Sequence, residues 1–78
     1  MNYDLFTQPA WPKGGQSREV LTYLHRHGSI SPREAMAFGC YRLAARIKDI
    51  RDLGWEIQTE AEAHDGGTHA RYRLPRMR

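Results

Sequence analysis

The sequence predicts a small, mainly α-helical domain with one β-hairpin, and three observations predict it. Apolar residues recur at helical spacing in three stretches, at about residues 17–27, 32–39 and 40–53. A glycine stands at or just after the end of each stretch, where glycine commonly terminates a helix. Polar and apolar residues then alternate on both sides of a glycine-rich turn, which predicts a hairpin within residues 55–74.

Length and charge narrow the class of protein. The chain has 78 residues, the size of one domain that folds on a single apolar core. Twelve Lys and Arg against nine Asp and Glu give a formal charge of +3, which weakly favours a polyanionic partner. The one cysteine, Cys40, excludes an internal disulfide and suits a reducing cytosol. No apolar run approaches the roughly 18 residues of a membrane span, and no secretory signal is seen, so we expect a cytoplasmic protein.

Residues 1–15 are predicted to form an extended arm in front of a folded domain of residues 16–78. Pro9, Pro12 and the pair Gly14–Gly15 interrupt regular structure there. Two interpretations of the apolar arm residues stay open: they pack on the body and complete a small core, or they bind another chain. These residues are Tyr3, Leu5, Phe6 and Trp11.

The first helix is expected from Ser17 to His27. Ser17 is a candidate N-cap, or Gln16 already lies in the first turn. Gly28 provides the left-handed residue at which the helix ends. The buried stripe of this helix consists of Val20, Leu21 and Leu24.

Residues 31–34 are a strong helix start. Ser31 caps the helix, Pro32 fits its first position, and Glu34 completes a capping box. The preceding pair, Ser29–Ile30, is long enough only for an isolated strand pairing with the hairpin. The apolar residues that this second helix is expected to bury before it stops at Gly39 are Ala35, Met36 and Phe38.

The third helix is expected to run from Cys40 or Tyr41 to Leu53. The spacing of Leu43, Ile47 and Ile50 places them on one buried face. At about 100° per residue, the outward residues are then Tyr41, Arg42, Ala45, Lys48, Asp49 and Asp52, with Arg46 and Arg51 at the flanks. A basic helix that follows a tight turn is typical of the helix-turn-helix, whose second helix enters the major groove of duplex DNA by its N-terminal end.

The hairpin has one apolar face and one charged face. The alternation places Trp55, Ile57, Thr59 and Ala61 on one face and Glu56, Gln58, Glu60 and Glu62 on the other. Residues 64–69 are the predicted turn. Arg71 and Arg73 can then lie opposite Glu60 or Glu62.

Candidate DNA contacts divide into those that read bases and those that hold the backbone. Arg42 is the predicted base reader, because an exposed arginine forms two hydrogen bonds with guanine. Tyr41 suits a thymine methyl group or a phosphate, and Lys48 suits a phosphate. Ser31 and Arg33 begin a helix, and helix N-termini bind phosphates. The full predicted set is Ser31, Arg33, Tyr41, Arg42, Ala45, Arg46, Lys48, His69 and Arg71, in which the last two place the hairpin near the DNA.

Several of these residues have a structural alternative that stays open. Arg46 can instead pair with Asp49, Glu34 or a carbonyl group. Arg51, beside Asp52, can be solvated surface. Arg71 and Arg73 can serve chiefly to neutralise the two glutamates of the opposite strand.

No residue pattern predicts an enzyme, a metal site or a cofactor. His25 and His27 are two positions apart on a helix and point to different faces, and His64 and His69 flank the hairpin turn. No second cysteine supports a zinc site. Nothing resembles a catalytic triad or a phosphate-binding glycine loop, so we expect a binding protein.

The order helix, short strand, helix, helix, hairpin is that of a winged helix. The chain also resembles the small winged helix-turn-helix proteins of bacteriophage and prophage genomes, in the segment GSISPREAMAFGCYRLAARIKDIRDLGWEIQTE followed by ARYRL. The resemblance covers about residues 20–74 and implies three helices with a two- or three-stranded antiparallel wing.

The resemblance further implies a role in a bacterial host cell. It implies binding to double-stranded DNA in phage or prophage transcription regulation or recombination. We expect a homodimer or tandem binding, because one module of such modest charge should bind weakly. The alternative is a protein-interaction module, such as a small phage inhibitor of a host defence complex, which uses the fold and the apolar arm as its binding surface.

Overall fold

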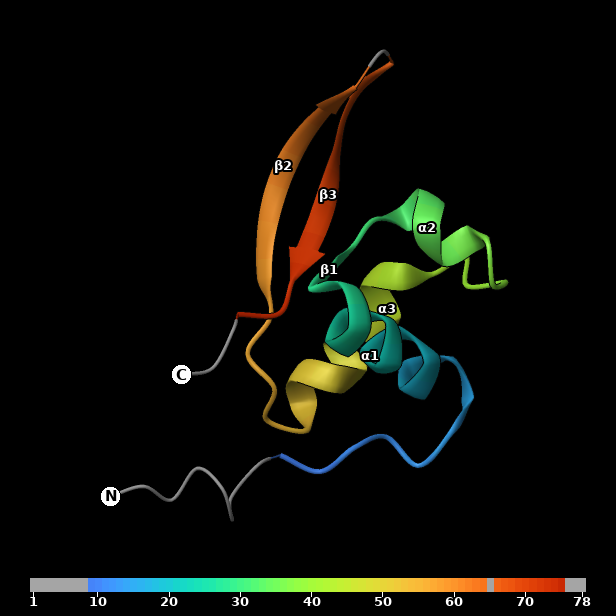
Figure 1. Ribbon diagram of the computed structural model, residues 1–78, viewed down its shortest axis with the longest axis vertical. Coiled ribbons are helices and arrows are strands. Elements are labelled where there is room, and N and C mark those ends of the chain that lie inside the picture. The colour runs from blue at the N-terminus through green and yellow to red at the C-terminus, as the bar shows by residue number, and fades with distance from the viewer. Residues whose placement is uncertain (1–8, 65, 76–78) are drawn as a thin grey trace.

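The computed structural model describes residues 9–64 and 66–75. A bundle of three helices packs against a three-stranded antiparallel sheet whose strand order is β1-β3-β2 (Figure 1). The elements in chain order are α1 (Gly15–His27), β1 (Ser29–Ile30), α2 (Pro32–Met36), α3 (Leu43–Asp52), β2 (Gln58–His64) and β3 (Gly67–Arg73). This arrangement confirms the predicted winged helix, and the wing has three strands.

The start of α1 differs from the prediction. Gly14 is the N-cap and no side chain caps the helix, so the assignment of Ser17 as the cap is wrong. The alternative, with Gln16 in the first turn, is confirmed. The Ser17 hydroxyl is oriented instead toward α3, where it donates to Asp49 Oδ2 at 3.1 Å. Gln16 Nε2 donates to the Gly39 carbonyl at 2.8 Å, so the start of α1 holds the turn that precedes α3.

The start of α2 has the predicted capping box. The Ser31 hydroxyl accepts from the Glu34 N–H at 3.3 Å, and Glu34 Oε1 accepts from the Ser31 N–H at 2.9 Å. Ala35 is buried as expected, and Phe38 is half-buried. The predicted burial of Met36 is wrong, because its side chain is 52% exposed. This helix has only five residues, so it presents one buried position to the core and Met36 falls outside it.

The third helix begins later than predicted. Gly39 adopts a φ of +88°, and the chain re-enters helical geometry only at Leu43, with Arg42 as the N-cap. Cys40 and Tyr41 therefore belong to the turn and not to the helix. The helix ends at Asp52, one residue before the predicted Leu53.

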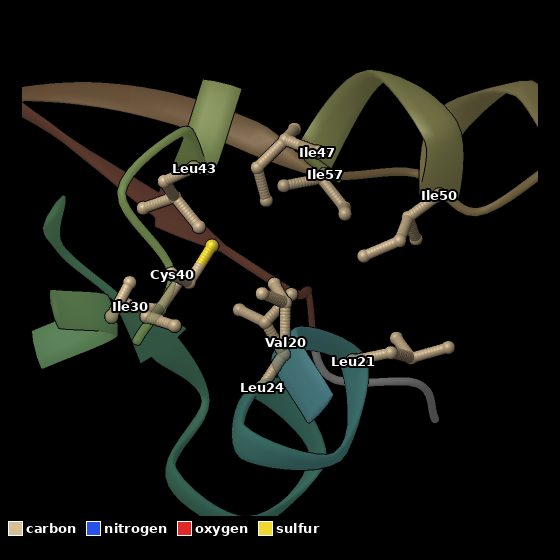
Figure 2. Close-up of a cluster of buried hydrophobic side chains, with 10 residues drawn as sticks. Val20, Leu21, Leu24, Ile30, Cys40, Leu43, Ile47, Ile50 and Ile57 are labelled. Carbon is tan, nitrogen blue, oxygen red and sulfur yellow. The ribbon is translucent and has the colours of Figure 1, made fainter. Parts of the chain in front are cut away.

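The core lies where the three helices meet the base of the sheet. Figure 2 shows nine labelled side chains that point toward a common centre from α1, α3, β1, the turn and the segment before β2. The buried apolar residues are Val20, Leu21, Leu24, Ile30, Ala35, Cys40, Leu43, Ile47, Ile50 and Ile57. The predicted stripes of the first and third helices are confirmed.

The hairpin is longer at its tip than predicted. The two strands stay paired as far as His64 and Gly67, so most of the expected turn is strand. At the other end β2 begins at Gln58 and not at Trp55. The tip stands away from the helices (Figure 1). Backbone hydrogen bonds hold the two strands together there, without an apolar face packed on the body. The base is joined to the body by β1, in which Ile30 pairs with Tyr72, as the predicted isolated pairing requires.

Candidate nucleic-acid interface

Two exposed side chains stand immediately before the first residue of α3. Tyr41 is 73% exposed, and Arg42 is also exposed. Both lie at the edge of a hollow of about 300 Å³ that Gln16, Gly39 and Arg46 complete. The hydrogen bond from Gln16 to Gly39 fixes the backbone of the turn that presents them. Within the described residues, the side chain of Arg42 forms no hydrogen bond or ion pair.

The other basic side chains of α3 have partners inside the domain. Arg46 Nη2 lies 3.3 Å from Asp49 Oδ2, and Lys48 Nζ lies 3.1 Å from Asp52 Oδ2. Arg46 is thus found in the structural pairing with Asp49 that the sequence left open. Ala45, between these pairs and the helix start, is half-buried.

Arg51 is not simply solvated surface. Its Nε donates to the Ile57 carbonyl at 3.2 Å, and Nη2 donates to the Thr59 hydroxyl at 3.0 Å. The guanidinium therefore connects the end of α3 to the beginning of β2. No pattern of neighbouring residues indicates this contact, because the acceptor is a backbone carbonyl beyond the helix end.

The start of α2 presents one free cation. Arg33 is exposed and has no hydrogen bond or ion pair with the described part of the chain. Ser31 is only 3% exposed, and its hydroxyl is used by the capping box. Of the two residues predicted to touch DNA here, Arg33 therefore has the accessible charge.

Arg71 is the most extensively bonded side chain of the wing. Its Nε donates to both oxygens of Glu62 at 3.0 Å, and Nη1 donates to Ser29 Oγ at 3.0 Å and to Glu34 Oε1 at 3.2 Å. His69 Nε2 lies 2.9 Å from Glu62 Oε1. These contacts connect β2, β3, β1 and α2.

The charges of this cluster affect one another. The hydrogen bond from Arg71 lowers the pKa of the Glu62 carboxyl, against the opposing effect of desolvation. The same hydrogen bond raises the pKa of Arg71. Glu60 likewise raises the pKa of Arg73, which it accepts from at 3.0 Å. The predicted pairing of the wing arginines with the two glutamates is observed, and the wing's charged face is largely self-neutralised.

The described part of the arm packs on the body. The Trp11 ring stacks on His25 with 4.9 Å between centroids and meets Trp55 edge-on at 5.9 Å. Trp55 Nε1 donates to the Ala10 carbonyl at 2.9 Å. Trp11 therefore follows the packing interpretation, whereas Tyr3, Leu5 and Phe6 lie outside the described residues.

The described residues contain no group of three or more His, Cys, Asp and Glu side chains that could hold a metal ion. His27 contacts Tyr23 at 4.2 Å between centroids, on a different side of α1 from the contact of His25 with Trp11. Cys40 is buried in the turn. None of the helices in the described ranges is long and apolar enough to cross a membrane.

A comparison with known protein families matches residues 15–76, which is most of the chain, to the winged helix-turn-helix domain family. The chain belongs to this winged helix-turn-helix family. Domains of the family are typically DNA-binding modules without enzymatic activity. No curated protein and no solved structure matches the chain.

In this winged helix-turn-helix domain, α2, the turn and α3 form the helix-turn-helix, and the hairpin of β2 and β3, with β1 paired to β3, forms the wing. The structure brings Tyr41, Arg42 and Arg46 to one hollow at the start of α3. Lys48 lies further along the same helix, and His69 and Arg71 lie in the ion-paired wing. One exposed residue of α3, Ala44, was not among the predicted contacts.

Proposed function

We propose that this winged helix-turn-helix domain binds double-stranded DNA in a sequence-specific manner. The observation that carries the proposal is the exposed pair Tyr41 and Arg42, which immediately precedes α3. A guanidinium without a partner can form the two hydrogen bonds that guanine offers in the major groove. Arg33, at the start of α2, is exposed and suits a backbone phosphate. The side chains expected to read bases are thus neither buried nor covered by acidic groups of the described chain.

The biological setting is part of the proposal. The resemblance of residues 20–74 to phage and prophage proteins supports a role as a transcription regulator or a recombination accessory factor in the cytoplasm of a bacterial host. The modest formal charge of +3 supports binding as a dimer or in tandem, since affinity for DNA depends largely on phosphate neutralisation.

The direct test is duplex binding by Arg42→Ala. We expect the wild-type protein to bind selected duplexes in a salt-sensitive way and Arg42→Ala to bind them about 5- to 150-fold more weakly, the range of one lost bidentate contact. Arg26→Ala is the matched control, because Arg26 is an exposed arginine on α1 with no ion pair among the described residues. Undetectable duplex binding at low salt would overturn the proposal, and an equal loss in the control would remove the assigned role of Arg42.

The protein-interaction alternative has less support, because Trp11 packs within the domain. It predicts that removal of residues 1–8 abolishes binding to a protein partner. The DNA proposal predicts that this truncation changes duplex affinity by less than about twofold, because α2, α3 and the Trp11 contacts remain.

A further inference from the structure

The outward surface of α3 has few polar groups that are free to read bases. Asp49 accepts from Ser17 and lies beside Arg46, while Lys48 and Asp52 pair with each other. Pairs as exposed as Lys48 and Asp52 are weak and can reorganise. Lys48 and Asp52 carry opposite charges on the same helix even when they separate, so this surface would present little net charge to a DNA groove.

What remains at the front of α3, beside the exposed Tyr41, is one guanidinium and two methyl groups. Ala44 is exposed and Ala45 is half-exposed. Ala45 lies one turn after Arg42, since its N–H donates to the Arg42 carbonyl at 3.1 Å. Side chains three positions apart on a helix are separated by roughly 5–6 Å. Successive bases on one strand rise by about 3.4 Å, so Arg42 and Ala45 would face bases one or two steps apart.

We infer that the domain selects a guanine that lies one or two steps from a pyrimidine with a C5-methyl group. This inference rests on the DNA binding proposed above. Arg42 bonds the guanine, and the methyl groups of Ala44 and Ala45 contact the C5-methyl in the major groove, where alanine recognises thymine. Thymine and 5-methylcytosine both carry this methyl group. Read-out by shape and apolar contact suits a helix whose other outward groups are ion-paired.

The test removes the methyl group from the DNA and leaves the protein unchanged. Sites are first selected from random duplexes, and each thymine of the best site is then replaced by deoxyuridine. We expect affinity to fall about fourfold at one or two positions near the guanine that requires Arg42, the value for one apolar carbon returned to water. Duplexes with cytosine or 5-methylcytosine at the same position distinguish the two sources of the methyl group.

Variants of the protein assign the contact. Ala44→Ser and Ala45→Ser keep the side chains small but replace their apolar tips, and at least one should bind the thymine and deoxyuridine duplexes equally. Ala63→Ser is the matched control, because Ala63 is exposed in the wing, and it should keep the fourfold ratio. Thermal unfolding of each variant confirms that the fold is intact.

The outcomes separate the two proposals. If no duplex is enriched, DNA binding fails and this inference fails with it. If duplexes are bound and Arg42→Ala weakens binding, but deoxyuridine has no effect at any position, only the methyl read-out is overturned. If serine at both alanine positions leaves the ratio unchanged, the methyl contact belongs to other residues and the assignment to α3 is wrong.

Discussion

Two serines show how tertiary contacts select among similar local signals. Ser17 and Ser31 both stand where a helix was expected to begin. Ser31 forms the capping box with Glu34, whereas the Ser17 hydroxyl donates to Asp49 on another helix. Pro32 and Glu34 reinforce the first signal, and no such neighbours accompany Ser17. A capping residue is therefore better predicted from a complete motif than from its own identity.

We predict that Ser31→Ala lowers the free energy of unfolding by about 1 kcal/mol, because it leaves the Glu34 N–H without its cap acceptor. Ser17→Ala serves as the control and should cost less than about 0.5 kcal/mol, since it removes only an exposed surface hydrogen bond. Urea denaturation of the two variants measures both values. Equal losses would mean that Ser17 contributes as a cap after all.

At the scale of elements, the wing is connected to α2 through Arg71. Arg71 joins Glu62 of β2 to Glu34 of α2, and its side chain is only 20% exposed. Arg73 pairs with Glu60 inside the hairpin and reaches no helix. The two arginines look equivalent in the sequence, but only Arg71 lies beside α2. Arg71 therefore helps to fix the orientation of the wing relative to α2. Its charge is already paired with Glu34 and Glu62 and is less available to DNA.

We predict that Arg71→Gln speeds amide hydrogen exchange in β3 and lowers stability by about 1 kcal/mol, because it removes charged hydrogen bonds to two elements. Arg73→Gln is the matched control and should affect β3 less. Exchange measured by mass spectrometry gives the comparison. The slope of duplex affinity against salt should be unchanged in Arg71→Gln, and a slope smaller by about one would show instead that Arg71 binds a phosphate.

The same cluster makes stability depend on pH. Arg71 lowers the folded-state pKa of Glu62 below its ordinary value of 4.5. The charged carboxylate therefore stabilises the fold above pH 4.5, and this contribution is lost as the pH falls through the folded-state pKa. We predict that Glu62→Gln flattens the fall in thermal stability below that pH. Glu56→Gln should keep the wild-type fall, because Glu56 is exposed and has no ion pair among the described residues.

At the scale of the whole molecule, part of the arm belongs to the folded body. Domains of this size have little stability to spare, so an added aromatic contact matters. Trp11 meets His25 of α1 and Trp55 after α3, and Arg18 lies 5.4 Å above its ring. Pro12 is buried, and its carbonyl accepts from Arg18 at 3.1 Å. Residues 9–12 therefore form a strap across the helices.

We predict that Trp11→Ala lowers the free energy of unfolding by about 1–2 kcal/mol, because a half-buried aromatic side chain is removed from its contacts. Lys13→Ala, an exposed position in the same segment, should change it by less than about 0.5 kcal/mol. Chemical denaturation compares them. Duplex affinity of the folded Trp11→Ala protein should stay near wild type, since Trp11 packs on His25 and Trp55 and does not line the hollow at the start of α3.

The sequence by itself determined the element order, the capping box at Ser31 and the buried faces of the first and third helices. These follow from local rules: helical periodicity, capping geometry and the left-handed preference of glycine. It also indicated the oppositely charged hairpin strands, because alternation alone decides which residues share a face of the sheet.

Only the tertiary structure decided which of the basic side chains remain free. Arg71 meets Glu34 and Arg51 meets the Ile57 carbonyl. Each of these contacts joins groups from different elements, so no local pattern in the sequence records it. These contacts occupy Arg51 and Arg71, whereas the guanidinium of Arg42 has no partner among the described residues. The candidate interface could therefore be assigned only from the folded structure.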